Sequence, residues 1–132
     1  MPNLADALTE LGDALAKVTV AAVADGGLRG LDDAAVLGAL AAAGRIRRHA
    51  EAVMVEAVAV ITDRDGGVGH ADRITTRYGC RTMSELVQRA TRVSRRTAGE
   101  VIAAAGAVQQ QVALSTGEVL PAQFPAMRAA FA

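Results

Sequence analysis

Apolar side chains near the start of the chain recur at alternating spacings of four and three residues. Asn3 precedes this pattern and can act as a helix N-cap, while Asp25-Gly26-Gly27 follows it as a helix stop. The pattern predicts one amphipathic helix whose apolar stripe is buried. The stripe consists of Leu4, Leu8, Leu11, Leu15, Val18 and Ala22.

A second helical pattern begins after Asp32, which can serve as its N-cap, and ends in the run Asp65-Gly66-Gly67-Val68-Gly69. One face stays apolar over about eight turns of helix. The short glycine-bearing connection predicts that the two helices pack antiparallel as a hairpin. The apolar face contains Val36, Leu40, Ala43, Ile46, Ala50, Val53, Met54, Ala57 and Ile61.

Two shorter helices follow, separated by the residues Arg-Val-Ser. Thr82 and Glu85 have the spacing of a capping box, and Ser94 can cap the next helix. The pair has the outline of a helix-turn-helix. Its apolar positions are Met83, Leu86, Val87 and Ala90 in the first helix and Ala98, Val101, Ile102, Ala105, Val108 and Val112 in the second.

These patterns predict an all-α fold, without strands or internal repeats, in a single domain of 132 residues. The tail is expected to form a loop from Ser115 to Pro121 and then a helix from about Pro125 that the chain end truncates. The expected parts are a hairpin at 1–64, a loop at 65–81, a helix-turn-helix-like pair at 82–113, and a loop with the start of another helix at 114–132.

The amino-acid composition reduces the number of functions that the chain could have. Only 2% of the residues are aromatic, and aromatic walls usually line small-molecule sites, so neither a cofactor nor a small-molecule substrate is expected. No uncharged apolar run is long enough for a membrane span, and the acidic N-terminus does not resemble a signal peptide. The lone Cys80 cannot form an internal disulfide. A cytoplasmic protein without membrane partners is expected.

Charge is distributed unevenly although the formal net charge is zero. Residues 1–72 contain six Lys/Arg and eleven Asp/Glu, a net charge of −5. Residues 73–132 contain eight Arg and three acids, a net charge of +5. The two halves are therefore expected to have different neighbours, and the basic half suits nucleic acid.

Basic side chains gather around the break between the two shorter helices. Residues in the first turn of the second helix can contact base edges or phosphates, and those at the first helix can hold the DNA backbone on either side. A solvated arginine-rich face would give the same pattern, and the turn has no glycine. The candidate DNA-binding residues are Arg81, Arg89, Arg92, Arg95, Arg96 and Thr97.

Catalytic and metal-binding residues are not expected. His49 lies among charges on a helix, and the acids around His70 in TDRDGGVGHAD only superficially resemble a cation loop. The calcium-loop template fails because Gly67 and Ile74 occupy two of its ligand positions. Helix capping and loop solubility explain the acids better. Cys80 has no cysteine or histidine partner for zinc, and no phosphate-binding, dinucleotide-binding or nucleophile-elbow motif occurs.

Several segments together carry a resemblance to a known family. They are ITDRDGG, the helix start Gly79–Thr82, the segment Val93–Ala98, and the stretch LSTGEVLP with the alanine-rich tail after it. From about Leu31 onward the chain resembles the arginine-rich helical domain of unknown function that precedes HNH endonuclease modules in many high-GC Gram-positive bacterial proteins.

That resemblance implies an accessory part of a nuclease-like protein. An HNH module cleaves phosphodiesters with a metal ion and a histidine, and the resemblance places that module beyond Ala132. The chain itself is expected to be a catalytically silent module that associates with DNA, and to form a homodimer or dock onto a downstream nuclease domain. The alternative is a helical protein-protein interaction or dimerisation module, using the stripe from Leu4 to Ala22, with no nucleic-acid role.

Overall fold

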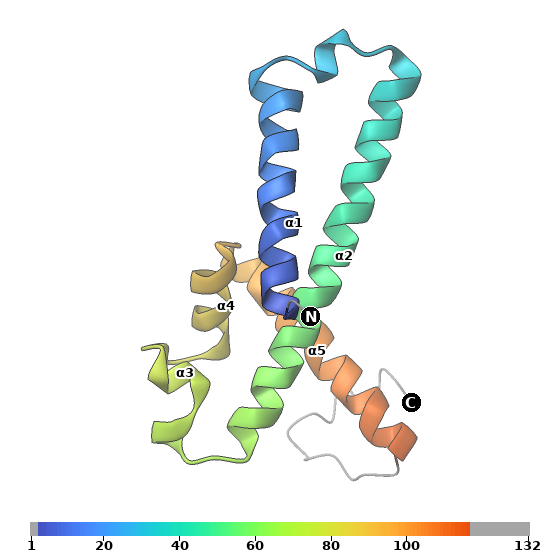
Figure 1. The fold of residues 1–132 in the computed structure, drawn as a ribbon. Coiled ribbons are helices and arrows are strands. Elements are labelled where there is room, and N and C mark those ends of the chain that lie inside the picture. The colour runs from blue at the N-terminus through green and yellow to red at the C-terminus, as the bar shows by residue number, and fades with distance from the viewer. Residues whose placement is uncertain (1–2, 117–132) are drawn as a thin grey trace. The chain divides into compact units, whose positions relative to one another are not determined.

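The computed structural model describes residues 3–116, which contain helices and no β-strand, so the prediction of an all-α fold is confirmed (Figure 1). The predictions for 117–132 concern residues outside this range. The α-helices are α1 (Leu4–Thr19), α2 (Asp33–Gly66), α3 (Ile74–Arg77), α4 (Met83–Thr91) and α5 (Arg95–Thr116). Contacts divide the chain into two compact units, Met1–Ile46 and Arg47–Ala132, where the sequence predicts one domain.

Helix α1 of the first unit begins and ends at the predicted signals. The backbone N–H of Asp6 donates a hydrogen bond of 2.8 Å to Asn3 Oδ1, which caps the helix. The helix continues into a π-helical turn, Val20–Ala24. Gly26 then adopts the left-handed conformation with φ +72°. Such a conformation favours glycine, so Gly26 ends the helix at low cost.

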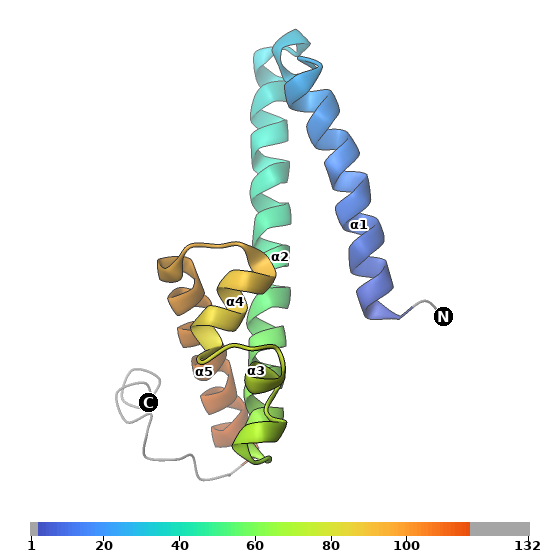
Figure 2. The same cartoon turned by 90° about the vertical axis from the view of Figure 1, so that its left-hand side faces the viewer.

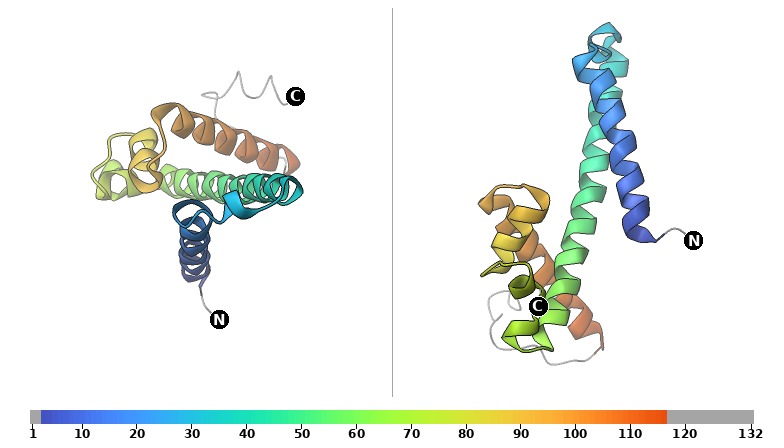
Figure 3. Two further views of the ribbon diagram at one scale, coloured as in Figure 1. Left: turned by 90° about the horizontal axis from the view of Figure 1, so that it is seen from above. Right: turned by 60° about the vertical axis from the view of Figure 1, so that its left-hand side comes forward.

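The connection to α2 includes a short 3-10 turn, Leu28–Gly30. The chain reverses there, so that α1 and the beginning of α2 run in opposite directions (Figure 3). Asp32 caps α2, because its Oδ1 accepts a 2.8 Å hydrogen bond from the N–H of Ala35. The cap predicted from the sequence is therefore confirmed.

The predicted burial of the α1 stripe is wrong for the single chain. None of the residues from 3 to 46 is buried, and the five large stripe residues from Leu4 to Val18 are 38–74% exposed. The partly shielded positions at the start of α2 include Ala35, Ala39 and Ala42. Alanine side chains are too short to cover leucines on a neighbouring helix. The predicted α2 face is likewise open here, since Leu40 is 70% exposed.

The second unit has a hydrophobic core, built by the C-terminal half of α2 together with α4 and α5 (Figure 2). Gln109 of α5 also ties the helices together, because its Nε2 donates to the carbonyl oxygen of Ala59 at 3.1 Å and to Asp63 Oδ1 at 2.6 Å. The buried core residues are Val58, Ala59, Val87, Ala98, Val101 and Ala105.

The buried face of α5 departs from the predicted stripe in its second half. Val108 and Val112 are 38% and 57% exposed, whereas Gln110 and Ala113 are buried. The side-chain amide of Gln110 has no hydrogen-bond partner among the described residues. An apolar pattern cannot reveal a glutamine that faces the interior. The helix also continues to Thr116, past the predicted start of a loop at Ser115.

The segment between α2 and α4, predicted as a loop, contains short helices, namely a 3-10 turn at His70–Asp72 and α3. Asp65 organises it. Its Oδ1 accepts a 2.7 Å hydrogen bond from the N–H of Ile74, and its Oδ2 accepts a 3.4 Å bond from Thr75 Oγ1. Helices of three or four residues have too few turns to show apolar periodicity.

Candidate nucleic-acid interface

Both helices of the α4–α5 pair begin with the predicted caps. The N–H of Glu85 donates to Thr82 Oγ1 at 3.1 Å, and Glu85 Oε2 accepts from the N–H of Arg81 at 2.9 Å. Similarly, the N–H of Thr97 donates to Ser94 Oγ at 3.1 Å. These bonds satisfy backbone donors that a helix leaves open at its amino end. The three-residue turn predicted from the sequence separates the helices.

The turn uses Arg92 in the left-handed conformation, with φ 59° and ψ 23°. Its backbone N–H donates a 2.8 Å hydrogen bond to the carbonyl oxygen of Gln88, which closes α4. Val93, the next residue, packs against the hydrophobic core. The turn therefore forms without glycine, at the energetic cost that a non-glycine residue has in this conformation.

Replacing Arg92 by glycine is expected to raise the free energy of unfolding by about 1 kcal/mol relative to Arg92→Ala. Both substitutions remove the guanidinium, but only glycine relieves the left-handed strain. The difference between the two variants in urea unfolding, followed by circular dichroism, measures this strain. Equal unfolding midpoints would show that the turn is relaxed with any residue at this position.

The structure separates the five candidate arginines into two groups. Glu85 draws Arg81 and Arg89 toward the start of α4: it binds the backbone of Arg81, and its Oε1 forms a 2.8 Å ion pair with Arg89 Nη2. Arg89 Nη1 also donates to the carbonyl oxygen of Gly79 at 3.4 Å. The sequence interpretation misses the role of Glu85 as an organiser of these arginines, although its spacing of four from Arg89 is typical of a helical ion pair.

Arg92, Arg95 and Arg96 form the second group, at the turn and in the first turn of α5, and all three are exposed. Arg96 Nε lies 3.5 Å from Glu100 Oε1, but its side chain is 90% exposed, so water screens this pair strongly. Within residues 3–116, no carboxylate lies within ion-pair distance of Arg92 or Arg95. These side chains are free to meet an anion.

Thr97 has a different role from the arginines. Its side chain is partly buried, and its Oγ1 accepts a 3.1 Å hydrogen bond from Ser94 Oγ. The hydroxyl is therefore part of the α5 cap. This hydrogen bond is a structural reason for a threonine at position 97 that involves no contact with DNA.

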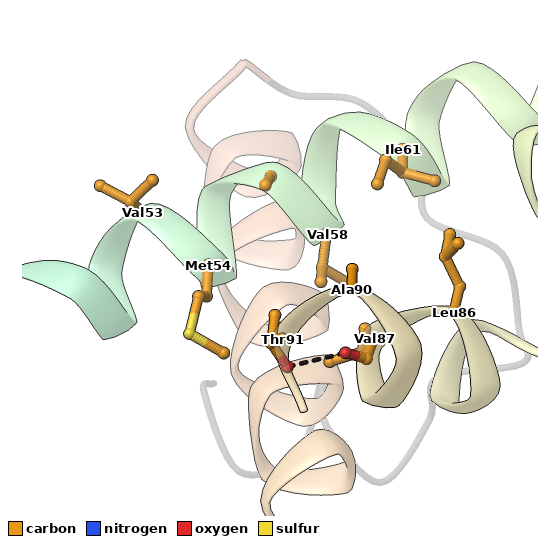
Figure 4. Close-up of a pocket in the computed structure, with 9 residues that line it drawn as sticks. Val53, Met54, Val58, Ile61, Leu86, Val87, Ala90 and Thr91 are labelled. Carbon is orange, nitrogen blue, oxygen red and sulfur yellow. Dashed lines mark hydrogen bonds between the residues drawn. The ribbon is translucent and has the colours of Figure 1, made fainter. Parts of the chain in front are cut away.

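A small apolar groove lies between α2 and α4 (Figure 4). Its volume is about 170 Å³, and the hydroxyl of Thr91, its one polar side-chain group, donates to the carbonyl oxygen of Val87 at 2.7 Å. The groove therefore offers no charge or free donor to a phosphate. Its lining consists of Val53, Met54, Ala57, Val58, Ile61, Leu86, Val87, Ala90 and Thr91.

Two acids in the last turns of α2 are used inside the fold. Asp65 accepts a hydrogen bond from the first N–H of α3, which is the capping role expected from the sequence in place of cation binding. Asp63 accepts a hydrogen bond from the side chain of Gln109. Among residues 3–116, no three His, Cys, Asp or Glu side chains are grouped so that they could hold a metal ion.

Comparison of the chain with protein-family models, with curated proteins and with solved structures gave no match. The features of the chain that bear on function are therefore the geometry and charge of the α4–α5 pair. Within the part of the chain that the structure describes, the helices lack the combination of length and hydrophobicity needed to cross a lipid bilayer.

Proposed function

We propose that this chain is a non-catalytic module that associates with DNA, as part of a cytoplasmic HNH endonuclease-type protein. The observation that carries the proposal is the group of exposed guanidiniums at Arg92, Arg95 and Arg96 around a short turn between two capped helices. The second helix of such a pair can present its amino end to a DNA groove.

The chemistry of this end of α5 suits a phosphate. The first backbone N–H groups of a helix have no partner within the helix, and the Ser94 side chain satisfies that of Thr97. The helix dipole adds a partial positive charge at the same end. Two arginines in that first turn, Arg95 and Arg96, extend the positive charge outward.

The remaining candidates have supporting roles in this proposal. Arg81 and Arg89 add positive charge at the start of α4 and contact the DNA backbone on that side of the helix pair. Glu85 limits the reach of Arg89, since the ion pair and the bond to Gly79 both hold its guanidinium. Thr97 contributes through the α5 cap.

No residue of the chain is assigned to catalysis or to a metal. The resemblance to domains that precede HNH modules supports a division of labour, in which this chain associates with DNA and a separate module cleaves it. Docking onto that nuclease module is part of the same proposal.

The test is the affinity of the unmodified chain for duplex DNA across a salt series. Each phosphate neutralised releases counterions, which contributes roughly −0.9 to the slope of log affinity against log salt. Contacts from the three arginines of the turn group would give a slope of about −2.7. A slope near zero, or no binding at low salt, would contradict the proposal.

A further inference from the structure

Gln110 of α5 is a buried side chain whose amide lacks a partner among residues 3–116. Only 1% of the residue is exposed, and neither its Nε2 nor its Oε1 has a hydrogen-bond partner in that range. The glutamines on either side differ, because Gln109 bonds to α2 and Gln111 is exposed. Buried amides in folded proteins are almost always hydrogen-bonded. Gln110 therefore requires a partner that residues 3–116 do not supply.

The surface that covers Gln110 is distinct from the core. Ala113, three residues further along the same side of α5, is 3% exposed but does not belong to the core cluster. Gly99 and Ala103 lie on this side of the helix nearer its start, and both are exposed. The covered side is therefore restricted to the carboxyl half of α5, beyond Ala103.

The chemistry of the amide limits what can lie against it. Oε1 needs a hydrogen-bond donor, and Nε2 needs an acceptor. An aliphatic side chain would satisfy neither atom, and a phosphate could only accept. A peptide backbone supplies both groups, because each non-proline residue carries one N–H and one carbonyl oxygen. A backbone segment that lies beside α5 is thus a complete partner for Gln110.

The part of the chain that follows α5 is close enough to supply this segment. Thr116 ends the helix six residues after Gln110, which is about 9 Å along the helix axis. Gly117 comes next in the sequence, and glycine is favoured where a chain turns at the end of a helix. Three extended residues then span about 10 Å, so residues 118–120 suffice to return to the level of Gln110.

A second copy of the chain is a weaker candidate for the same position. A segment joined to α5 by so short a connection has an effective concentration on the order of millimolar at this site. A second copy would have to bring the same backbone groups from solution. The attached segment is therefore favoured at ordinary protein concentrations.

We propose that the segment 118–124 runs back along the carboxyl half of α5 and bonds to Gln110 through its backbone. One N–H of the segment donates to Oε1 of Gln110, and one of its carbonyl oxygens accepts from Nε2. Gln110 is thus the anchor that holds the chain after α5 against the helix. This inference does not depend on the proposed DNA function.

The experiment is amide hydrogen exchange by NMR on the full chain, residues 1–132, without DNA. In the parent, at least one backbone amide of 118–124 should exchange about tenfold or more slowly than in an unstructured peptide. Gln110→Ala should remove this protection but keep that of α5, since alanine is a good helix former. Gln111→Ala is the matched control, because it makes the same change at the exposed neighbouring position, and it should leave both unchanged.

Nuclear Overhauser contacts between the Nε2 protons of Gln110 and residues 118–124 are also expected in the parent. They test the same contact without a substitution, so the test stands even if Gln110→Ala fails to fold. The proposal would be overturned if 118–124 exchanges like an unstructured peptide, or if folded Gln110→Ala keeps the protection. Protection that grows with protein concentration would also overturn it, since a second copy would then supply the partner. Because no DNA is present, none of these results bears on DNA binding by the α4–α5 pair.

Discussion

Replacing Ala98 by leucine should lower the free energy of unfolding by about 1–3 kcal/mol, because the larger side chain overpacks the core. Ala98 is fully buried, and it belongs to the cluster in which Val58 of α2, Val87 of α4 and Val101 of α5 meet. Leucine adds three carbon atoms where only a methyl group fits. The helices must shift to admit them, and urea unfolding measures the destabilisation.

The matched control is the same side chain one residue further along α5. Gly99 is exposed, and a Cβ atom built there meets no neighbouring atom within 4 Å. Gly99→Leu should therefore stabilise the helix by roughly 0.5–1 kcal/mol, since glycine is a poor helix former. If Ala98→Leu had the same midpoint of urea unfolding as the parent, α5 would not pack on α2 and α4 as described.

The starts of α1, α2, α4 and α5 could be predicted from the sequence because they depend on local chemistry. Asn3, Asp32, Thr82 and Ser94 each cap a helix through a side-chain oxygen three residues from its donor. A cap and the backbone donors that it satisfies lie within one turn of helix. Such signals do not depend on what the helix later packs against.

Burial could be predicted less well because it depends on the partner of a helix. The stripe of α1 is more regular than that of α5, yet α1 is exposed and α5 contributes to the core. Gln110 shows the converse, since a polar residue occupies a buried position. An apolar period identifies a face that can be buried, but the neighbouring helix decides whether it is.

The sequence indicated which residues form the candidate site, but not how their side chains are arranged. All five arginines are exposed, but Glu85 gathers Arg81 and Arg89 at the start of α4, apart from Arg92, Arg95 and Arg96 at the turn. The ion pair between Glu85 and Arg89 joins residues only four positions apart, so this spacing in the sequence is enough to predict it. The left-handed Arg92 could not be predicted, because the sequence offers no glycine there.

Replacing Arg95 and Arg96 together by glutamine should weaken duplex binding more than any other pair of exposed arginine substitutions. Both guanidiniums lie in the first turn of α5, where the helix dipole and open N–H groups favour an anion. Each phosphate that is no longer neutralised should reduce the salt slope by roughly 0.9, and removing a bidentate hydrogen bond to a base should cost about 1–3 kcal/mol on the preferred sequence only. Glutamine is also a good helix former, so folding should be unchanged.

The charge-matched control is Arg45→Gln with Arg48→Gln, which removes the same charge from exposed positions on another helix, α2. The deciding measurement is the salt dependence of duplex affinity for the parent and for both double variants. We expect the salt slope of the Arg95/Arg96 variant to be shallower by about 1.8, and the Arg45/Arg48 variant to keep the parent's slope. Equal reductions in the two variants would show that the turn arginines contribute only to a diffuse positive field, and would contradict a DNA contact by the α4–α5 pair.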